Sequence, residues 1–246
     1  IPPTPTQNAR STPRAPMRSH HILLALFAFS LIAPPVFAHA IGGSDAEFVR
    51  TTIGADPFPF LYLGAKHMVT GYDHLLFLVG VIFFLYRLKD VLLYVTLFSL
   101  GHSTTLLLGV IFDLGFSSHL VDMVIGLSVS YKAFENLGGF RRIGFEIDNR
   151  IAVGGFGLVH GLGLATKLQA LGLNPDGLIP NLISFNIGVE IGQLIALSLI
   201  LVVMTFWRTT KSFGRYAVAA NALLFLAGIV LAGEQLAGYF LVGDAR

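Results

Sequence analysis

Histidines and carboxylates lie inside stretches of this sequence that are otherwise apolar. His67, Asp73 and His74 open one such stretch, and His102 and His160 lie within two others. An ionisable side chain at bilayer depth costs about 2.5–3.5 kcal/mol on insertion scales, so several in one chain require a function. Imidazole and carboxylate groups bind transition metals and carry protons. These residues therefore indicate an ion site or path inside a membrane.

The spacing of these residues predicts which of them share a helical face. Asn186 and Glu190, in a fourth apolar stretch, are four residues apart and stack on one face. His67 and His74 are seven apart, which is nearly two helical turns, so that a continuous helix would place His74 about 10 Å deeper. Asp73 then points to the side, where it either binds the ion or fixes the tautomer of His74.

The composition is that of an integral membrane protein. Hydrophobic residues make up 54% of the 246, charged residues 12%, and the mean hydropathy is +0.73, whereas soluble domains carry roughly 25% charge. The chain has no cysteine, which excludes disulfides, iron–sulfur clusters and thiolate sites. The net charge of +2 does not predict a nucleic-acid partner, because the basic residues lie in short loops where membrane topology explains them.

The amino-terminal region resembles a secretory signal. Residues 1–16 precede Met17, a candidate start of translation, and residues 17–38 combine a basic beginning, a short apolar run and a small-x-small cleavage site. We expect cleavage after Ala38 or after Ala40. The alternative is an uncleaved first helix, but the apolar run is shorter than the ~20 residues that a span needs. A signal of this kind implies a bacterial envelope membrane.

Six longer apolar runs follow and predict an all-α bundle of six transmembrane helices after a cleaved signal peptide. Residues 39–60 are then an external segment, residues 61–241 the six-helix domain and residues 242–246 an external tail. The predicted spans are roughly 66–86, 91–112, 119–138, 151–171, 178–206 and 214–241.

The distribution of Lys and Arg predicts the topology. Loops 87–90, 139–150 and 207–215 carry these residues, and the intervening loops 113–118 and 172–177 carry none. Because basic loops stay in the cytoplasm, we expect a multi-pass protein of the bacterial inner membrane with both mature termini in the periplasm.

This topology predicts that the polar residues share one depth. The first span runs inward, with His67 at the outer rim; His102 and His160 then fall near mid-depth, and Asn186 and Glu190 lie one and two turns below the outer end of their helix. Four helices would thus contribute to one layer between the outer rim and the midplane. Such an arrangement is typical of an ion path that is lined by polar side chains.

Small residues accompany two of the polar residues. Gly157-x-x-x-Gly161 surrounds His160, and Gly188-x-x-x-Gly192 surrounds Glu190. Both are close-packing patterns of membrane helices. They predict backbones that approach closely and leave room for an ion, although plain helix packing explains the glycines equally well.

Other polar residues in the apolar runs receive no ion-binding role. Glu135 has Lys132 three residues earlier and is interpreted as structural, Asp122 as interfacial polarity and His119 as a loop residue. The role of Glu234 stays open.

Four motifs in series resemble those of the HupE/UreJ family of membrane proteins. They are His67-x5-Asp73-His74-Leu-Leu, Ser99-x2-His102-Ser-x-Thr, Gly157-Leu-Val-His160-Gly-Leu-Gly-x-Ala and Asn186-x-Gly-Val-Glu190-x-Gly-Gln193. The resemblance extends over nearly all of the mature region, about residues 55–241. The resemblance implies a signal peptide, six helices and a nickel or cobalt permease associated with hydrogenase or urease maturation. It also implies that the first motif is a metal site, with His102, His160 and Glu190 as co-ligands. Nickel members of the family often have proline at the position of Met68. In this respect the chain is more similar to the broader branch of the family.

The sequence thus predicts a secondary permease, not an enzyme, that binds a divalent transition metal and passes it inward. The predicted metal ligands are His67, Asp73, His74, His102, His160, Asn186 and Glu190. Nitrogen and oxygen ligands suit Ni, Co, Zn, Fe(II), Mn or Cu(II); the resemblance favours nickel or cobalt. Because ligands bind in their deprotonated forms, transport could be coupled to protons through Glu190.

Three other functions fit parts of the pattern. The chain could be an accessory or assembly subunit of a larger membrane complex, with partner membrane subunits or as a homo-oligomer. It could be a proton-coupled transporter of an organic or anionic solute, although the lack of an intramembrane arginine cluster argues against an anion. A membrane hydrolase is a weaker alternative, because the sequence has no His-Glu-x-x-His motif.

Overall fold

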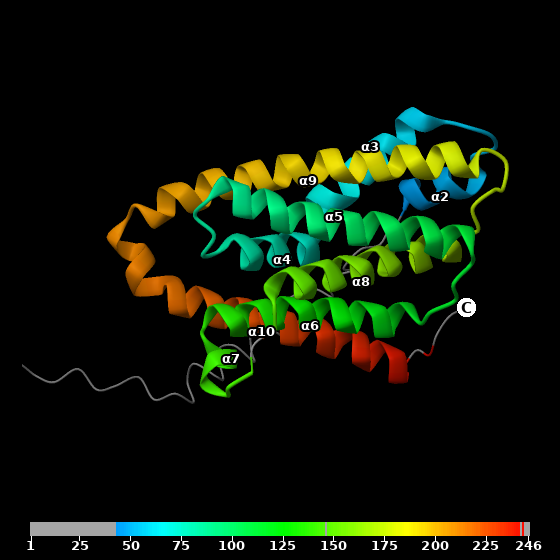
Figure 1. Cartoon of the computed structure of the whole chain (residues 1–246). Helices are drawn as coiled ribbons and strands as arrows, with labels where there is room; N and C mark the ends of the chain where they lie inside the picture. Colours follow the sequence, from blue (N-terminus) through cyan, green and yellow to red (C-terminus); the bar gives the residue numbers. More distant parts are fainter. Residues whose placement is uncertain (1–42, 146, 242, 244–246) are drawn as a thin grey trace, which may run out of the picture. The chain divides into compact units, whose positions relative to one another are not determined.

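A computed structural model describes residues 43–145, 147–241 and 243. The predicted signal peptide (17–38), the residues before it and the tail 242–246, except residue 243, lie outside the described residues. The described part is all-α, as predicted, and contains no strand. Its helices (Figure 1) are α2 (Ser44–Thr51), α3 (Pro57–Thr70), α4 (Tyr72–Ile82), α5 (Leu88–Ile111), α6 (Ser118–Asn136), α7 (Gly139–Arg142), α8 (Asn149–Ala170), α9 (Leu178–Arg208) and α10 (Lys211–Leu241).

Four of the described helices are long and apolar enough to cross a membrane: α5, α8, α9 and α10. The chain is therefore a multi-pass membrane protein. The predicted first span, 66–86, is two helices, because the chain leaves helical geometry at Gly71 (φ −71°, ψ 105°). Neither α3 with 14 residues nor α4 with 11 reaches the ~20 residues of a span by itself.

The helical structure begins earlier than the sequence analysis predicted. Residues 39–60 were expected to form an external segment before the first span, yet α2 lies within this segment and α3 begins at Pro57. Proline suits the first helical position, where its missing N–H group is not needed. Two contacts with α9 fix this start: Asn181 Oδ1 accepts from the Asp56 N–H (2.7 Å), and the Ser184 hydroxyl donates to the Pro57 carbonyl (2.5 Å).

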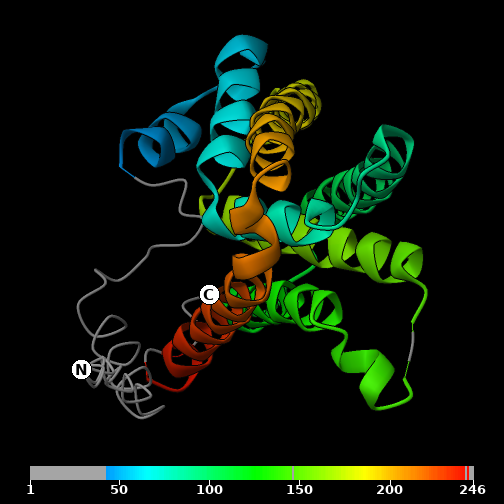
Figure 2. The same ribbon diagram turned by 90° about the vertical axis from the view of Figure 1, so that its left-hand side faces the viewer.

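The longer helices pack as three pairs: α3 with α9, α5 with α8, and α6 with α10. Each pair lies side by side in both ribbon views (Figures 1 and 2). Glycines stand at the crossings, because a Cβ atom on Gly64, Gly157 or Gly228 would collide with the backbone of the opposite helix. The sequence prediction of close packing at residues 157–161 and 188–192 is thus confirmed: Gly161 meets the His102 carbonyl, and Gly188 meets that of Leu61.

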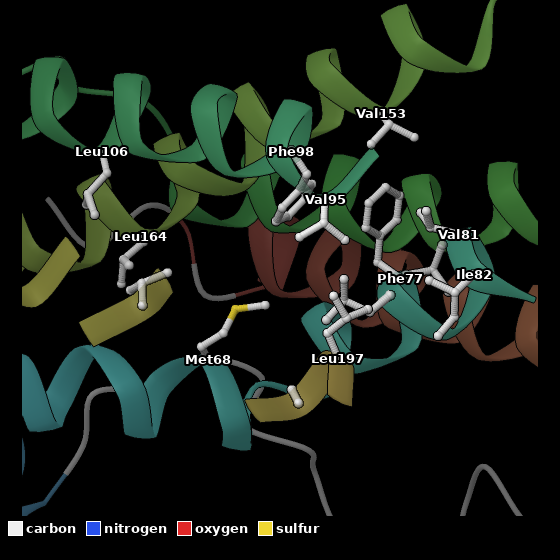
Figure 3. Packing of buried hydrophobic residues seen from close by; sticks show 14 of the residues in the cluster. Met68, Phe77, Val81, Ile82, Val95, Phe98, Leu106, Val153, Leu164 and Leu197 are labelled. Carbon is white, nitrogen blue, oxygen red and sulfur yellow. The ribbon is translucent and has the colours of Figure 1, made fainter. Parts of the chain in front are cut away.

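The short helix α4 lies among these pairs and is buried on most of its surface. It packs against α6, α9, α10 and the end of α3. Phe77, Val81 and Ile82 are at most 3% exposed. Figure 3 shows them in the buried core, where the ring of Phe77 lies 5.2 Å from that of Phe98 of α5. A helix enclosed in this way can carry polar side chains away from lipid, which is the property that the candidate site uses.

Arg208, at the end of α9, holds the carboxyl end of α4. Its guanidinium donates to the carbonyls of Ile82 and Phe83, the latter at 2.9 Å. The last carbonyls of a helix have no partner within the helix and require a donor of this kind.

We expect the substitution Arg208→Gln to destabilise the protein by about 1.5–3 kcal/mol, the usual contribution of hydrogen bonds from a charged donor. Thermal unfolding in detergent measures this loss. Arg215→Gln, at an exposed position of the same predicted cytoplasmic region, is the control and should leave the unfolding temperature unchanged. Equal unfolding temperatures for the two variants would show that Arg208 does not secure α4.

Candidate metal centre

The break between α3 and α4 brings two histidines into contact. The rings of His67 and His74 lie with their centres 5.2 Å apart, edge to face. The Gly71 N–H donates to the His67 carbonyl (2.9 Å), and the Gly71 carbonyl accepts from the Leu75 N–H (3.0 Å), so Gly71 keeps both of its backbone hydrogen bonds at the break. A Cβ atom on Gly71 would lie only 3.0 Å from the His67 carbonyl and 3.1 Å from His74 Nδ1, so glycine suits this position.

The predicted geometry of these two histidines is therefore wrong in one respect. A continuous helix would have stacked His74 about 10 Å below His67, but the break at Gly71 removes that separation. His67 lies in the last turn of α3, which starts at Pro57, and it is buried; its position at the outer rim stays a prediction.

His74 lies at the centre of a cluster of four imidazoles. Its ring centre is 5.8 Å from that of His102 on α5 and 5.1 Å from that of His160 on α8, as well as 5.2 Å from that of His67. The three inner rings, of His74, His102 and His160, are each 1% exposed. Four helical segments thus place four titratable rings in one dry region.

Hydrogen bonds set the tautomers of two of the rings. His74 Nδ1 lies 3.0 Å from Asp73 Oδ1, and that same oxygen accepts from the His74 backbone N–H (2.7 Å). His160 Nδ1 lies 2.7 Å from the Phe156 carbonyl. Because a carboxylate and a carbonyl can only accept, Nδ1 carries the proton in each neutral ring and Nε2 carries the lone pair. Metal-binding histidines are usually oriented by a second hydrogen bond of this type.

Some buried nitrogens and oxygens in this region have no hydrogen-bond partner within the structure. They include both ring nitrogens of His102, Nε2 of His160 and Oδ1 of Asn186. Buried polar atoms are nearly always satisfied, so such a group calls for an explanation, and a bound ion is one. In the residues that the structure describes, however, no three His, Asp or Glu side chains already stand in the geometry of a metal site.

Glu190 and Asn186 lie on α9, and Glu190 contacts the helix that carries His102. Glu190 Oε1 accepts from the Ser103 hydroxyl (3.2 Å), which follows His102 on α5. One turn further along α9, Gln193 accepts from Ser99 of α5 (2.7 Å). Asn186 follows Phe185, whose ring centre is 6.3 Å from that of His67. The structure thus groups the four histidines with Asp73, and it ties Glu190 to the same helix as His102.

A layer of phenylalanines borders the histidines on one side, and the sequence analysis did not identify it. The ring of Phe98 is 4.9 Å from that of His160, and the ring of Phe77 is 5.3 Å from His160 and 5.2 Å from Phe98. Phe156 packs against Phe77 at 5.8 Å. Each of these residues is one helical turn from a histidine of its own helix, and that spacing was the available signal.

An ion pair joins α8 to α6. Along α8 it lies beyond His160, on the side away from Phe156. Lys167 Nζ is 2.8 Å and 3.0 Å from the two carboxylate oxygens of Asp122 on α6. Asp122 is 8% exposed, so the interpretation of this residue as interfacial polarity is wrong: it is a buried partner of a lysine.

Two other polar residues form contacts away from the histidines. Glu135 accepts from Lys132 and from Asn149 (2.7 Å), which agrees with its structural interpretation. His119 lies in α6 rather than in a loop, because Ser117 caps a helix that begins at Ser118. Its Nδ1 is 2.9 Å from Gln235 Oε1, so Gln235 joins α10 to α6.

Comparison with known proteins gives one match. A protein-family model described as "HupE / UreJ protein" matches residues 43–242. No curated protein and no solved structure matches the chain. The matched residues contain all four histidines of the cluster together with Asp73, Asn186 and Glu190.

Proposed function

Because the chain belongs to the HupE/UreJ family, we propose that it is a secondary permease that binds a divalent transition-metal ion and carries it across the membrane. The family is that of membrane proteins related to nickel and cobalt transport, so these two metals are the first candidates. Zinc and copper suit the same nitrogen and oxygen ligands.

The observation that supports this function is the contact of three other imidazoles with His74. Rings that share one ion have centres about 4.5–6 Å apart, because each ligating nitrogen lies ~2.0–2.1 Å from the metal. The centres of His67, His102 and His160 are 5.1–5.8 Å from that of His74 and so fall in this range. Rotation of the rings within the cluster would complete the coordination, with Asp73 orienting His74.

The interrupted helix supports transport rather than a fixed structural ion. Transporters commonly place their substrate where a membrane helix is broken, since the exposed backbone and side chains there line a cavity rather than lipid. We propose that α3 and α4 together form one crossing, and that α5, α6, α8, α9 and α10 form the other five. The phenylalanine layer of Phe77, Phe98 and Phe156 would then close the path on the cytoplasmic side of the metal.

The direct test of this proposal is the metal content of the protein. Protein purified without chelator is analysed by mass spectrometry before and after loading with Ni, Co, Zn, Cu, Fe and Mn salts. We expect about one ion per chain and uptake of the same metal into proteoliposomes. Absence of metal above background after every loading would contradict the proposal and favour an accessory subunit. Bound metal without uptake would indicate a structural ion.

Proton coupling through Glu190 gives a further prediction. Glu190→Gln should remove the acceleration of metal uptake by a proton gradient, because glutamine cannot release or accept the proton that the ion displaces. Equilibrium binding should fall by about tenfold or less, since the imidazoles remain. Uptake into proteoliposomes at matched and unmatched pH measures the coupling. Glu234→Gln, at an exposed glutamate of α10, is the control; a Glu190→Gln variant that still responds to the gradient would place coupling elsewhere.

A further inference from the structure

A groove of about 330 Å³ runs along α6, and Phe156 of the phenylalanine layer is among the residues that line it. Its floor follows α6, its walls come from α8 and α10, and α7 contributes Phe140 at one end. The lining residues are Val124, Leu127, Ser128, Ser130, Tyr131, Phe134, Phe140, Phe156, Phe225 and Ile229. Figure 2 shows α7 and the adjoining end of α6.

The groove is apolar although two serines line it. The Ser128 hydroxyl donates to the Ile125 carbonyl (2.7 Å), and the Ser130 hydroxyl donates to that of Phe225 (2.8 Å). Both groups are therefore satisfied by backbone and offer little to a polar ligand. Leu127 and Ile229, by contrast, are 42% and 43% exposed, so the groove is open towards its surroundings.

The short helix α7, which contributes Phe140 to one end of this groove, also carries Arg141 and Arg142. The ring of Phe140 packs against Tyr131 with centres 4.7 Å apart and against Phe134 at 4.9 Å, which fixes α7 over the end of the groove. Arg142 follows two residues later and is exposed. The acidic residues that follow it most closely in the sequence are Glu146 and Asp148, and Asp148 accepts the Arg150 backbone N–H at the start of α8. The segment lies in a loop whose three arginines predict a cytoplasmic position.

We propose that this groove binds one acyl chain of an anionic phospholipid, whose phosphate contacts Arg142. An apolar channel that ends at a basic segment matches a lipid in both parts: the chain contacts the phenylalanines and aliphatic residues, and the headgroup meets the guanidinium at the membrane surface. Basic residues at the cytoplasmic surface attract anionic lipids, and arginine binds phosphate with paired hydrogen bonds. The groove is formed by α6, α7, α8 and α10, and the proposal does not depend on metal transport.

Native mass spectrometry of the intact protein tests the proposal. The protein is titrated with dioleoylphosphatidylglycerol or with dioleoylphosphatidylcholine, and the fraction carrying one lipid is measured. We expect the anionic lipid to bind about fivefold more tightly, the effect of one arginine near a phosphate surface. Arg142→Gln should remove this preference and retain binding of the neutral lipid, whereas Arg215→Gln should keep it. Ile229→Trp, which fills the groove from an exposed position, should weaken binding of both lipids.

A tryptophan on a lipid-facing position outside the groove is the matched control. Leu199 of α9 is 65% exposed, and Leu199→Trp should leave lipid binding at the wild-type level. Equal binding of the two lipids by the wild type, or an unchanged preference in Arg142→Gln, overturns the proposal. A stable dimer that only Ile229→Trp dissociates also overturns it, because the groove would then hold a second copy of the chain.

Discussion

Replacement of His74 by alanine is expected to abolish stoichiometric metal binding and, with it, metal uptake. His74 is the ring that contacts the other three, so its removal takes away a ligand and the common neighbour of His67, His102 and His160. Loss of an outer-shell partner alone costs about 10–100-fold in metal affinity, and we expect loss of this ring to exceed that. Metal per chain, measured by mass spectrometry on purified His74→Ala, gives the result.

His119→Ala is the matched control for this substitution. His119 is also a histidine of a long helix, α6, but it contacts Gln235 and lies outside the cluster. It should retain metal at the wild-type level, which separates loss of a ligand from loss of any intramembrane histidine. Wild-type metal content and uptake in His74→Ala would rule out the cluster as the binding site. Equal loss in both variants would point to a general structural defect instead.

The second large effect is expected at the crossing of α5 and α8. Gly157→Leu should prevent these helices from packing, because even a Cβ atom at this position would collide with the backbone carbonyl of Phe98. Overpacking of a core that can adjust costs about 1–3 kcal/mol; here the obstacle is backbone, which cannot rotate away, so we expect a greater loss. The variant should unfold at a much lower temperature or fail to give a monodisperse monomer in detergent.

The same helix provides the control two residues away. A Cβ atom on Gly155 meets nothing within 4 Å, so Gly155→Leu should be tolerated and should even favour the helix by up to about 1 kcal/mol. Size-exclusion profiles and thermal unfolding of the two variants, prepared side by side, measure the difference. Similar stability of Gly157→Leu and Gly155→Leu would mean that α5 and α8 do not approach as closely as the structure indicates.

Much of the candidate site could be predicted because polar residues are rare in apolar sequence. His102 and His160 stand out against the spans around them, and their helices place them beside His74 as expected. The spacing of Asn186 and Glu190 likewise predicted a common helix, α9. Residue type and helical spacing were sufficient to predict which side chains face the interior, because burying a polar group in a membrane is costly and few positions in a fold accept one. Their role as metal ligands remains a prediction.

The local break and the pairing of helices could not be read from the sequence in the same way. Gly71 lies in a run whose apolar character continues on both sides, and glycine within a membrane helix is common. Its non-helical geometry depends on contacts between His67, Gly71 and His74 that only the folded chain provides. The pairing of Lys167 with Asp122 was missed for a related reason: the two residues are far apart in sequence, and no local pattern joins them.

The three glycine-matched helix pairs have a consequence for the order of biosynthesis. The partner of α3 is α9, which is synthesised roughly 100 residues later, and at ~5–20 residues per second this delay is roughly 5–20 s. Throughout that interval the ribosome has delivered His67 and His74 to the membrane without the helix that covers them. The nascent chain must therefore be sheltered, by the insertion machinery or by transient neighbours, until α9 arrives. An mRNA truncated after the codons of α8 would give a chain whose buried histidines lack the cover of α9. We expect membrane proteases to degrade such a chain.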